Sequence, residues 1–144
     1  MEELLVRYAH FLGIIFLASM LAIENVLLSK ILKREVVGKL AIIDSLYGLS
    51  AIVTLTAGLL LWFAVGKPSQ FYTSNVVFHA KVGLFVLIAL LSILPTLFFL
   101  KSRRLNVQEI LVPKHIIYIV RLEVVLLLLL PLLAVLMARG YGAA

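Results

Sequence analysis

The sequence lacks cysteine and has few charged residues, with Cys 0 and only 14% Asp, Glu, Lys and Arg. Without cysteine, the chain has no disulfide, no thiolate metal site, no iron–sulfur cluster and no covalently attached c-type haem. A soluble domain contains about 25% charged and about 45–50% apolar residues, whereas this chain is 64% hydrophobic. The composition therefore excludes a soluble globular domain, a disordered chain and a free nucleic-acid-binding module, and it predicts a protein embedded in lipid.

Four apolar segments of the 144-residue chain are long enough to cross a bilayer, which takes about 20 residues. The N-terminus is acidic and lacks the basic region of a secretory signal, so the first segment is interpreted as a retained span. The short linkers favour antiparallel neighbours. We predict a single all-α transmembrane domain over residues 1–144, an up-down-up-down four-helix bundle. Its spans are expected at about residues 6–28, 40–65, 76–100 and 115–138.

The basic residues, which give a net charge of +6, gather in two of the three linkers. These are Lys30, Lys33, Arg34 and Lys39 in the first linker, and Lys101, Arg103, Arg104 and Lys114 in the third. The middle linker has only Lys67. The positive-inside rule therefore places the first and third linkers in the cytoplasm and both termini outside, on the periplasmic side. We expect a multi-pass protein of the bacterial cytoplasmic (inner) membrane that contacts lipid headgroups and binds no nucleic acid.

An outer layer of ionisable residues is predicted inside the spans, formed by His10, His79 and Lys81. Since His79 and Lys81 are two residues apart, a helix points them to different sides. We expect Lys81 to face inward and His79 to lie at the interface. The plainer interpretations stay open, namely a Lys81 amine that reaches back toward the headgroups and a His10 that only bonds a neighbouring helix.

An inner layer of polar residues is predicted near the cytoplasmic side of the spans. Its members are Glu24, Asp44, Tyr47, Arg121 and Glu123, with Asn25, Ser92 and Thr96 at similar depth. Because an unpaired buried charge is costly, we expect Arg121 to pair with Glu24 or Asp44. Such a cluster serves either as a structural lock between helices or as a relay for protons or substrate.

Among cofactors, b-type haem is the most compatible with this composition. A lone histidine on one span cannot complete a zinc site, which needs three or four ligands. A haem iron needs only one or two axial ligands, and an apolar bundle offers it a slot of low dielectric.

Short motifs in every span resemble a bacterial family of four-span membrane proteins of unknown function. They are residues 8–12 (YAHFL), 44–48 (DSLYG), 79–81 (HAK), 95–96 (PT) and 138–142 (ARGYG). The chain also resembles, more distantly, the four-span membrane protoporphyrinogen IX oxidases and the copper-resistance D proteins. It shares with them the order of His10, the HAK motif and Glu123 before a leucine-rich run. The oxidases differ in having a tryptophan-rich first helix and further histidines.

The distant resemblance implies that His10 is an axial haem ligand and that Lys81 is needed for activity, pairing with a propionate or transferring protons. The leading hypothesis is therefore a membrane protein that binds haem or porphyrin. It would either transfer electrons or oxidise a porphyrinogen, with a quinone or respiratory-chain acceptor. Two alternatives stay open. One is a proton-coupled transporter or permeation subunit that uses the inner layer and assembles as a homo-oligomer, and the other is a ligand-free structural or assembly protein.

Overall fold

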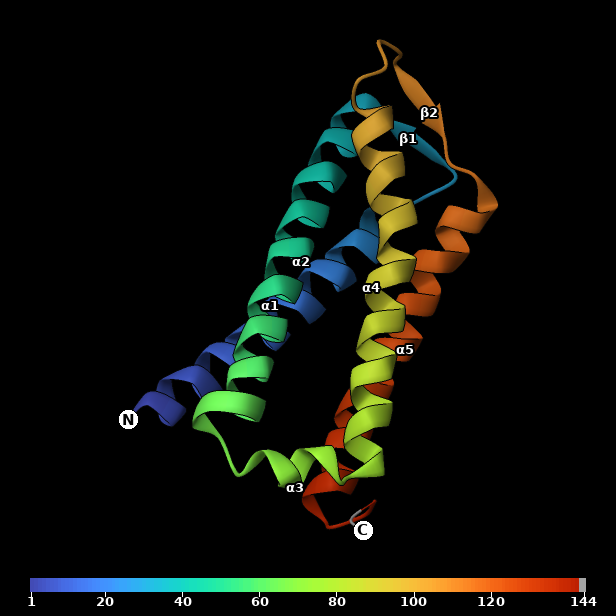
Figure 1. The fold of residues 1–144 in the computed structure, drawn as a ribbon. Helices are drawn as coiled ribbons and strands as arrows, with labels where there is room; N and C mark the ends of the chain where they lie inside the picture. Colours follow the sequence, from blue (N-terminus) through green and yellow to red (C-terminus); the bar gives the residue numbers. More distant parts are fainter. Residues whose placement is uncertain (143–144) are drawn as a thin grey trace.

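Four long helices form the body of the protein in the computed structural model, which describes residues 1–142 (Figure 1). They are α1 (Glu2–Leu27), α2 (Arg34–Leu60), α4 (Val76–Ser102) and α5 (Lys114–Ala138). All four are long and apolar enough to cross a membrane, so the prediction of an all-α bundle of four spans is confirmed. Pro95 and Pro131 lie within α4 and α5, which continue through them.

The bundle is built from two antiparallel helix pairs. Helix α1 packs mainly on α2, and α4 packs mainly on α5, while smaller α2–α4 and α1–α5 contacts join the pairs. Helix α1 crosses α2 obliquely, so that its first turns diverge from the other helices (Figure 1). The buried apolar core lies toward the end where α1 turns into α2, around Leu21, Leu40, Phe99 and Val120.

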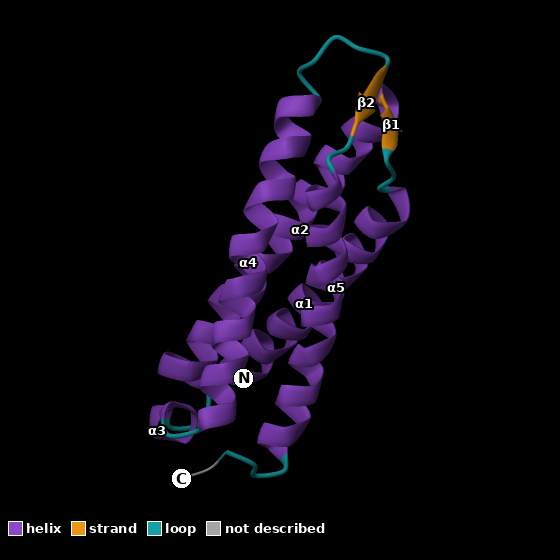
Figure 2. Ribbon diagram, turned by 90° about the vertical axis from the view of Figure 1, so that its right-hand side faces the viewer, coloured by secondary structure: helices purple, strands orange, loops and turns teal. Residues whose placement is uncertain are grey.

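The first and third linkers are joined by a small sheet that the sequence analysis did not predict. Strand β1 (Ile31–Lys33) pairs antiparallel with β2 (Glu109–Leu111), and Leu32 lies opposite Ile110 (Figure 2). Leu32 and Ile110 are both buried, so this pair of strands closes the core at one end. We call this end the basic end, meaning residues 28–33 and 103–113 with the adjoining helix ends.

At the opposite end, α2 continues into a π-helical turn, η1 (Leu61–Val65), and the short helix α3 (Ser69–Thr73) leads to α4 (Figure 1). The Asn75 side chain caps α4 by accepting a 3.1 Å hydrogen bond from the Phe78 amide. The amide of Val76 donates to the carbonyl of Gly142, which fixes the chain after α5. Both termini lie toward this end (Figure 2), as an up-down-up-down bundle requires.

Candidate functional site

Three helices bring together three buried carboxyl groups near the middle of the core. Glu24 of α1, Asp44 of α2 and Glu123 of α5 are 1%, 4% and 1% exposed. The carboxyl groups of Glu24 and Asp44 interact directly, and that of Glu123 lies close to both. We call Glu24, Asp44 and Glu123 the carboxyl cluster. The inner layer predicted from the sequence thus supplies residues that do meet in space.

Two hydroxyl groups contact the carboxyl cluster. Tyr47 donates a 3.2 Å hydrogen bond to Oε1 of Glu123. The hydroxyl of Thr96 lies 2.5 Å from Oδ2 of Asp44 and 2.8 Å from the carbonyl oxygen of Ser92. A hydroxyl group has a single proton to donate, whereas a carbonyl oxygen can only accept. If the Thr96 proton goes to Ser92, then Asp44 must be the donor in the short contact and must carry a proton.

Two oxygen atoms of the cluster are buried without any donor among residues 1–142. They are Oε2 of Glu24 and Oδ1 of Asp44. A buried acceptor without a partner is costly, and a buried anion without one is costlier. Since these two carboxyl groups interact directly, a proton on either of them supplies the missing donor.

Arg121 does not pair with the cluster, and the prediction of an ion pair with Glu24 or Asp44 is wrong. Its Nη1 donates to the backbone carbonyl and the side-chain oxygen of Asn25, at 2.6 and 3.0 Å, and the residue is exposed. Arg121 and Glu123 are two residues apart on α5, so they point to different sides of the helix. Within residues 1–142 the salt bridge that forms is Arg7–Glu3, at the far end of α1. The carboxyl cluster therefore has no cation beside it.

The His10 side chain packs against α2 between Thr54 and Gly58. Its Nδ1 lies 3.0 Å from the carbonyl oxygen of Thr54, and a Cβ added to Gly58 would lie 3.3 Å from the imidazole ring. Because a carbonyl only accepts, Nδ1 carries the hydrogen and Nε2 is left as an acceptor. His10 is half-buried, and Lys81 and Arg7 are its nearest cations.

The residues of the predicted outer layer differ in burial. Lys81 is half-buried and lies near His10, whereas His79 is exposed and its Nε2 lies 2.6 Å from the carbonyl oxygen of Thr73. His10 and Glu24 are 14 residues apart on α1, or about 21 Å at 1.5 Å per residue. The His10–Lys81 pair and the carboxyl cluster are therefore separate candidate sites.

The sequence analysis missed Gly13, which lets α1 approach α2 between these two sites. A Cβ on Gly13 would collide with the hydroxyl of Thr54, the residue whose carbonyl binds His10. Its spacing in the sequence could have indicated this contact, because Gly13 lies one helical turn after His10 on the same face of the helix. Residues 1–142 contain no group of three or more histidines and carboxylates placed to hold a metal ion.

The chain belongs to the family described as "Predicted membrane protein (DUF2214)", which it matches over residues 2–142. This confirms the resemblance to a four-span membrane family of unknown function. No curated protein and no solved structure matches the chain. The more distant resemblance to the membrane protoporphyrinogen oxidases and copper-resistance D proteins stays a prediction.

Proposed function

We propose that this member of the DUF2214 family is a proton-coupled membrane protein, a transporter or permeation subunit that binds protons at the carboxyl cluster. The observation that carries the proposal is the burial of Glu24, Asp44 and Glu123 together, with no salt bridge to a cation among residues 1–142. Ionisable side chains within membrane spans are costly, and they mark substrate or ion pathways and proton relays.

Electrostatics supports proton binding at this cluster. Like charges in direct contact in a medium of low dielectric repel strongly, so neighbouring carboxyl groups there do not all ionise. An ion-pair lock between helices would need a cation to pair with them, and Arg121 is engaged with Asn25 instead. The Tyr47 hydroxyl adds a second group from α2, and the Thr96 hydroxyl extends the network to α4. Both offer further positions through which a proton can move.

Infrared spectroscopy tests the proposal directly. We expect the purified protein at neutral pH to show the carbonyl stretch of buried, protonated carboxyl groups, and to lose part of that band as the pH is raised. Asp44→Asn should remove part of the signal. Glu35→Gln is the matched control, because Glu35 is an exposed carboxylate at the start of α2. A wild-type protein without this band would contradict the proposal.

Reconstitution then tests transport. In liposomes with an entrapped pH indicator and an imposed potential, the wild-type chain should admit protons faster than empty liposomes, with or without a co-transported solute. Asp44→Asn should reduce the rate to that of empty liposomes, whereas Glu35→Gln should not. Four spans are few for a transporter, so we expect a homo-oligomer in the membrane, which cross-linking in native membranes measures.

We also propose a second function, haem b binding at His10, which rests on the Nδ1 contact with Thr54. A backbone carbonyl on Nδ1 fixes the tautomer that presents Nε2 to iron, and Lys81 supplies a cation for a porphyrin propionate. Bound haem would supply one-electron redox chemistry, with a porphyrinogen as donor and a quinone as acceptor. The carboxyl cluster carries the leading proposal because its three ionisable groups are buried together in the core.

An absorption spectrum separates the two candidates. Protein purified in mild detergent from haem-supplied cells should show a Soret band if His10 binds haem, and His10→Ala should abolish it. His79→Ala is the matched control, since His79 is exposed and bonded to Thr73. Haem-supplied material without a Soret band would rule out the haem site and leave the carboxyl cluster unaffected.

A further inference from the structure

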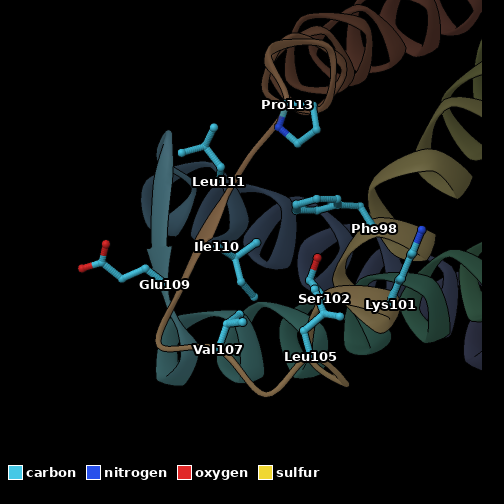
Figure 3. A pocket seen from close by; sticks show the side chains of 9 residues that line it. All are labelled: Phe98, Lys101, Ser102, Leu105, Val107, Glu109, Ile110, Leu111 and Pro113. Carbon is cyan, nitrogen blue, oxygen red and sulfur yellow. The ribbon is translucent and has the colours of Figure 1, made fainter.

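A cavity opens at the basic end, between the last turns of α4 and strand β2 (Figure 3). Its volume is about 450 Å³, within the range of about 300–1,000 Å³ of small-molecule sites. Its walls are mostly apolar, including Phe98, Ile110, Leu111 and Pro113. This cavity is far from His10 and plays no part in the functions proposed above.

The polar residues that line the cavity are Lys101, Ser102 and Glu109. Lys101 and Ser102 reach it from the end of α4, and the Lys101 side chain extends beside Phe98 (Figure 3). The Glu109 carboxylate points away from the cavity in the same view. Lys101 forms no salt bridge with any of residues 1–142, so its charge is available to an anion from outside the chain.

The surroundings of the cavity are strongly basic. Arg103 and Arg104 follow α4, and Lys114 begins α5. The first linker brings Lys30, Lys33, Arg34 and Lys39 to the same end. The acidic residues of this end are Glu35 and Glu109. Because the cavity begins where the apolar span α4 ends, it lies at the level of the lipid headgroups. Basic pockets at this depth bind anionic headgroups.

We propose that this cavity binds an anionic phospholipid. Its phosphate pairs with the Lys101 ammonium and accepts a hydrogen bond from Ser102. The beginning of an acyl chain lies against Phe98, Ile110 and Leu111. The apolar walls favour a lipid over a free anion, because a free anion has no acyl chain to pack against them. The unpaired cation favours an anionic lipid over a zwitterionic one, which has no net charge.

Native mass spectrometry of the full chain in mild detergent tests this proposal, with phosphatidylglycerol and phosphatidylcholine of identical acyl chains as probes. We expect phosphatidylglycerol to bind about fivefold more tightly, since one basic residue near the surface contributes about 1 kcal/mol. Lys101→Gln should remove that preference. Lys67→Gln is the control at the opposite end, where the Lys67 ammonium lies 4.4 Å from the Phe71 ring centre. An unchanged preference in Lys101→Gln overturns the proposal.

A second variant tests the apolar walls. Val107 is partly exposed at the rim, so Val107→Trp should fill the cavity without disturbing the core. It should weaken the binding of both lipids, with an unchanged unfolding temperature. Glycerol phosphate, which has the headgroup chemistry without the chains, should not compete with phosphatidylglycerol. Equal competition by glycerol phosphate, or undiminished lipid binding in Val107→Trp, would show that the cavity does not hold a lipid.

Discussion

Gly13 on α1 packs directly against Thr54 on α2, at a point where a single added methyl group would collide with the threonine hydroxyl. Small residues allow two helices to approach closely in lipid, where dispersion contacts and hydrogen bonds rather than hydrophobicity drive association. The contact lies one helical turn from the bond between His10 and the Thr54 carbonyl. Helix packing and the position of the imidazole are therefore coupled.

Gly13→Ala is expected to force α1 away from α2 and to destabilise the bundle by about 1–3 kcal/mol, the usual cost of overpacking. Thermal unfolding in detergent, followed by circular dichroism, measures the loss. Gly48→Ala is the matched control on α2, because a Cβ at that position meets nothing within 4 Å. If both variants unfold at the same temperature, the close approach at Gly13 has no energetic role.

Asp44→Asn is expected to leave the unfolding temperature unchanged or to raise it. A protonated aspartic acid and an asparagine are both neutral donors of similar shape, and the amide also supplies a donor to the unpartnered oxygen of Glu24. If Asp44 were instead ionised and paired with a cation, Asp44→Asn would destabilise the protein strongly, by about 3–5 kcal/mol. A large drop in unfolding temperature would thus indicate a buried ion pair in place of shared protons.

Arg121→Gln is expected to change stability by less than about 1 kcal/mol, as for other exposed polar contacts. Its effect should add to that of Asp44→Asn in the double variant, because groups that do not interact contribute independently. The unfolding temperatures of the two single variants and the double variant measure the coupling. A clear departure from additivity would mean that the guanidinium does interact with the carboxyl cluster.

Leu32→Ala is expected to lower stability by about 2–5 kcal/mol, since it opens a cavity beneath the small sheet. Leu32 and its partner Ile110 are buried, whereas the neighbouring pair Ile31 and Leu111 faces outward. Leu111→Ala therefore removes a similar side chain of the same sheet and should have little effect. Equal losses in both variants would show that the two faces of the sheet do not differ as the structure indicates.

The predicted span positions agree closely with the helices because hydropathy alone defines them. Where they differ, local chemistry is the reason: α1 begins at Glu2 and α2 at Arg34, since helices continue into the polar interface beyond the apolar stretch. The β1–β2 sheet could not be predicted, because each strand has three residues and is stabilised by a partner about 80 residues away. No local pattern encodes such a pairing.

The sequence could predict which residues lie in the inner layer, but not which of their side chains contact one another. Depth along a helix follows from the rise per residue, so Glu24, Asp44 and Glu123 could be placed at one level from the sequence. The direction of each side chain depends on how the helices rotate against one another. That rotation turns Arg121 toward Asn25 on the outer surface, and it leaves the carboxyl groups facing one another.

The scarcity of charge and four long apolar segments determined by themselves that this chain lies in lipid as four helices, because the bilayer requires about 20 apolar residues per span. The absence of cysteine excluded only thiol chemistry. The tertiary structure alone decided which of the few charges meet. Helix packing buries three carboxyl groups that form no salt bridge within the described part of the chain. It also fixes His10 on Thr54 and places Lys101 at the rim of an apolar cavity. Those contacts depend on residues distant in sequence, and packing selects them only once the helices have assembled.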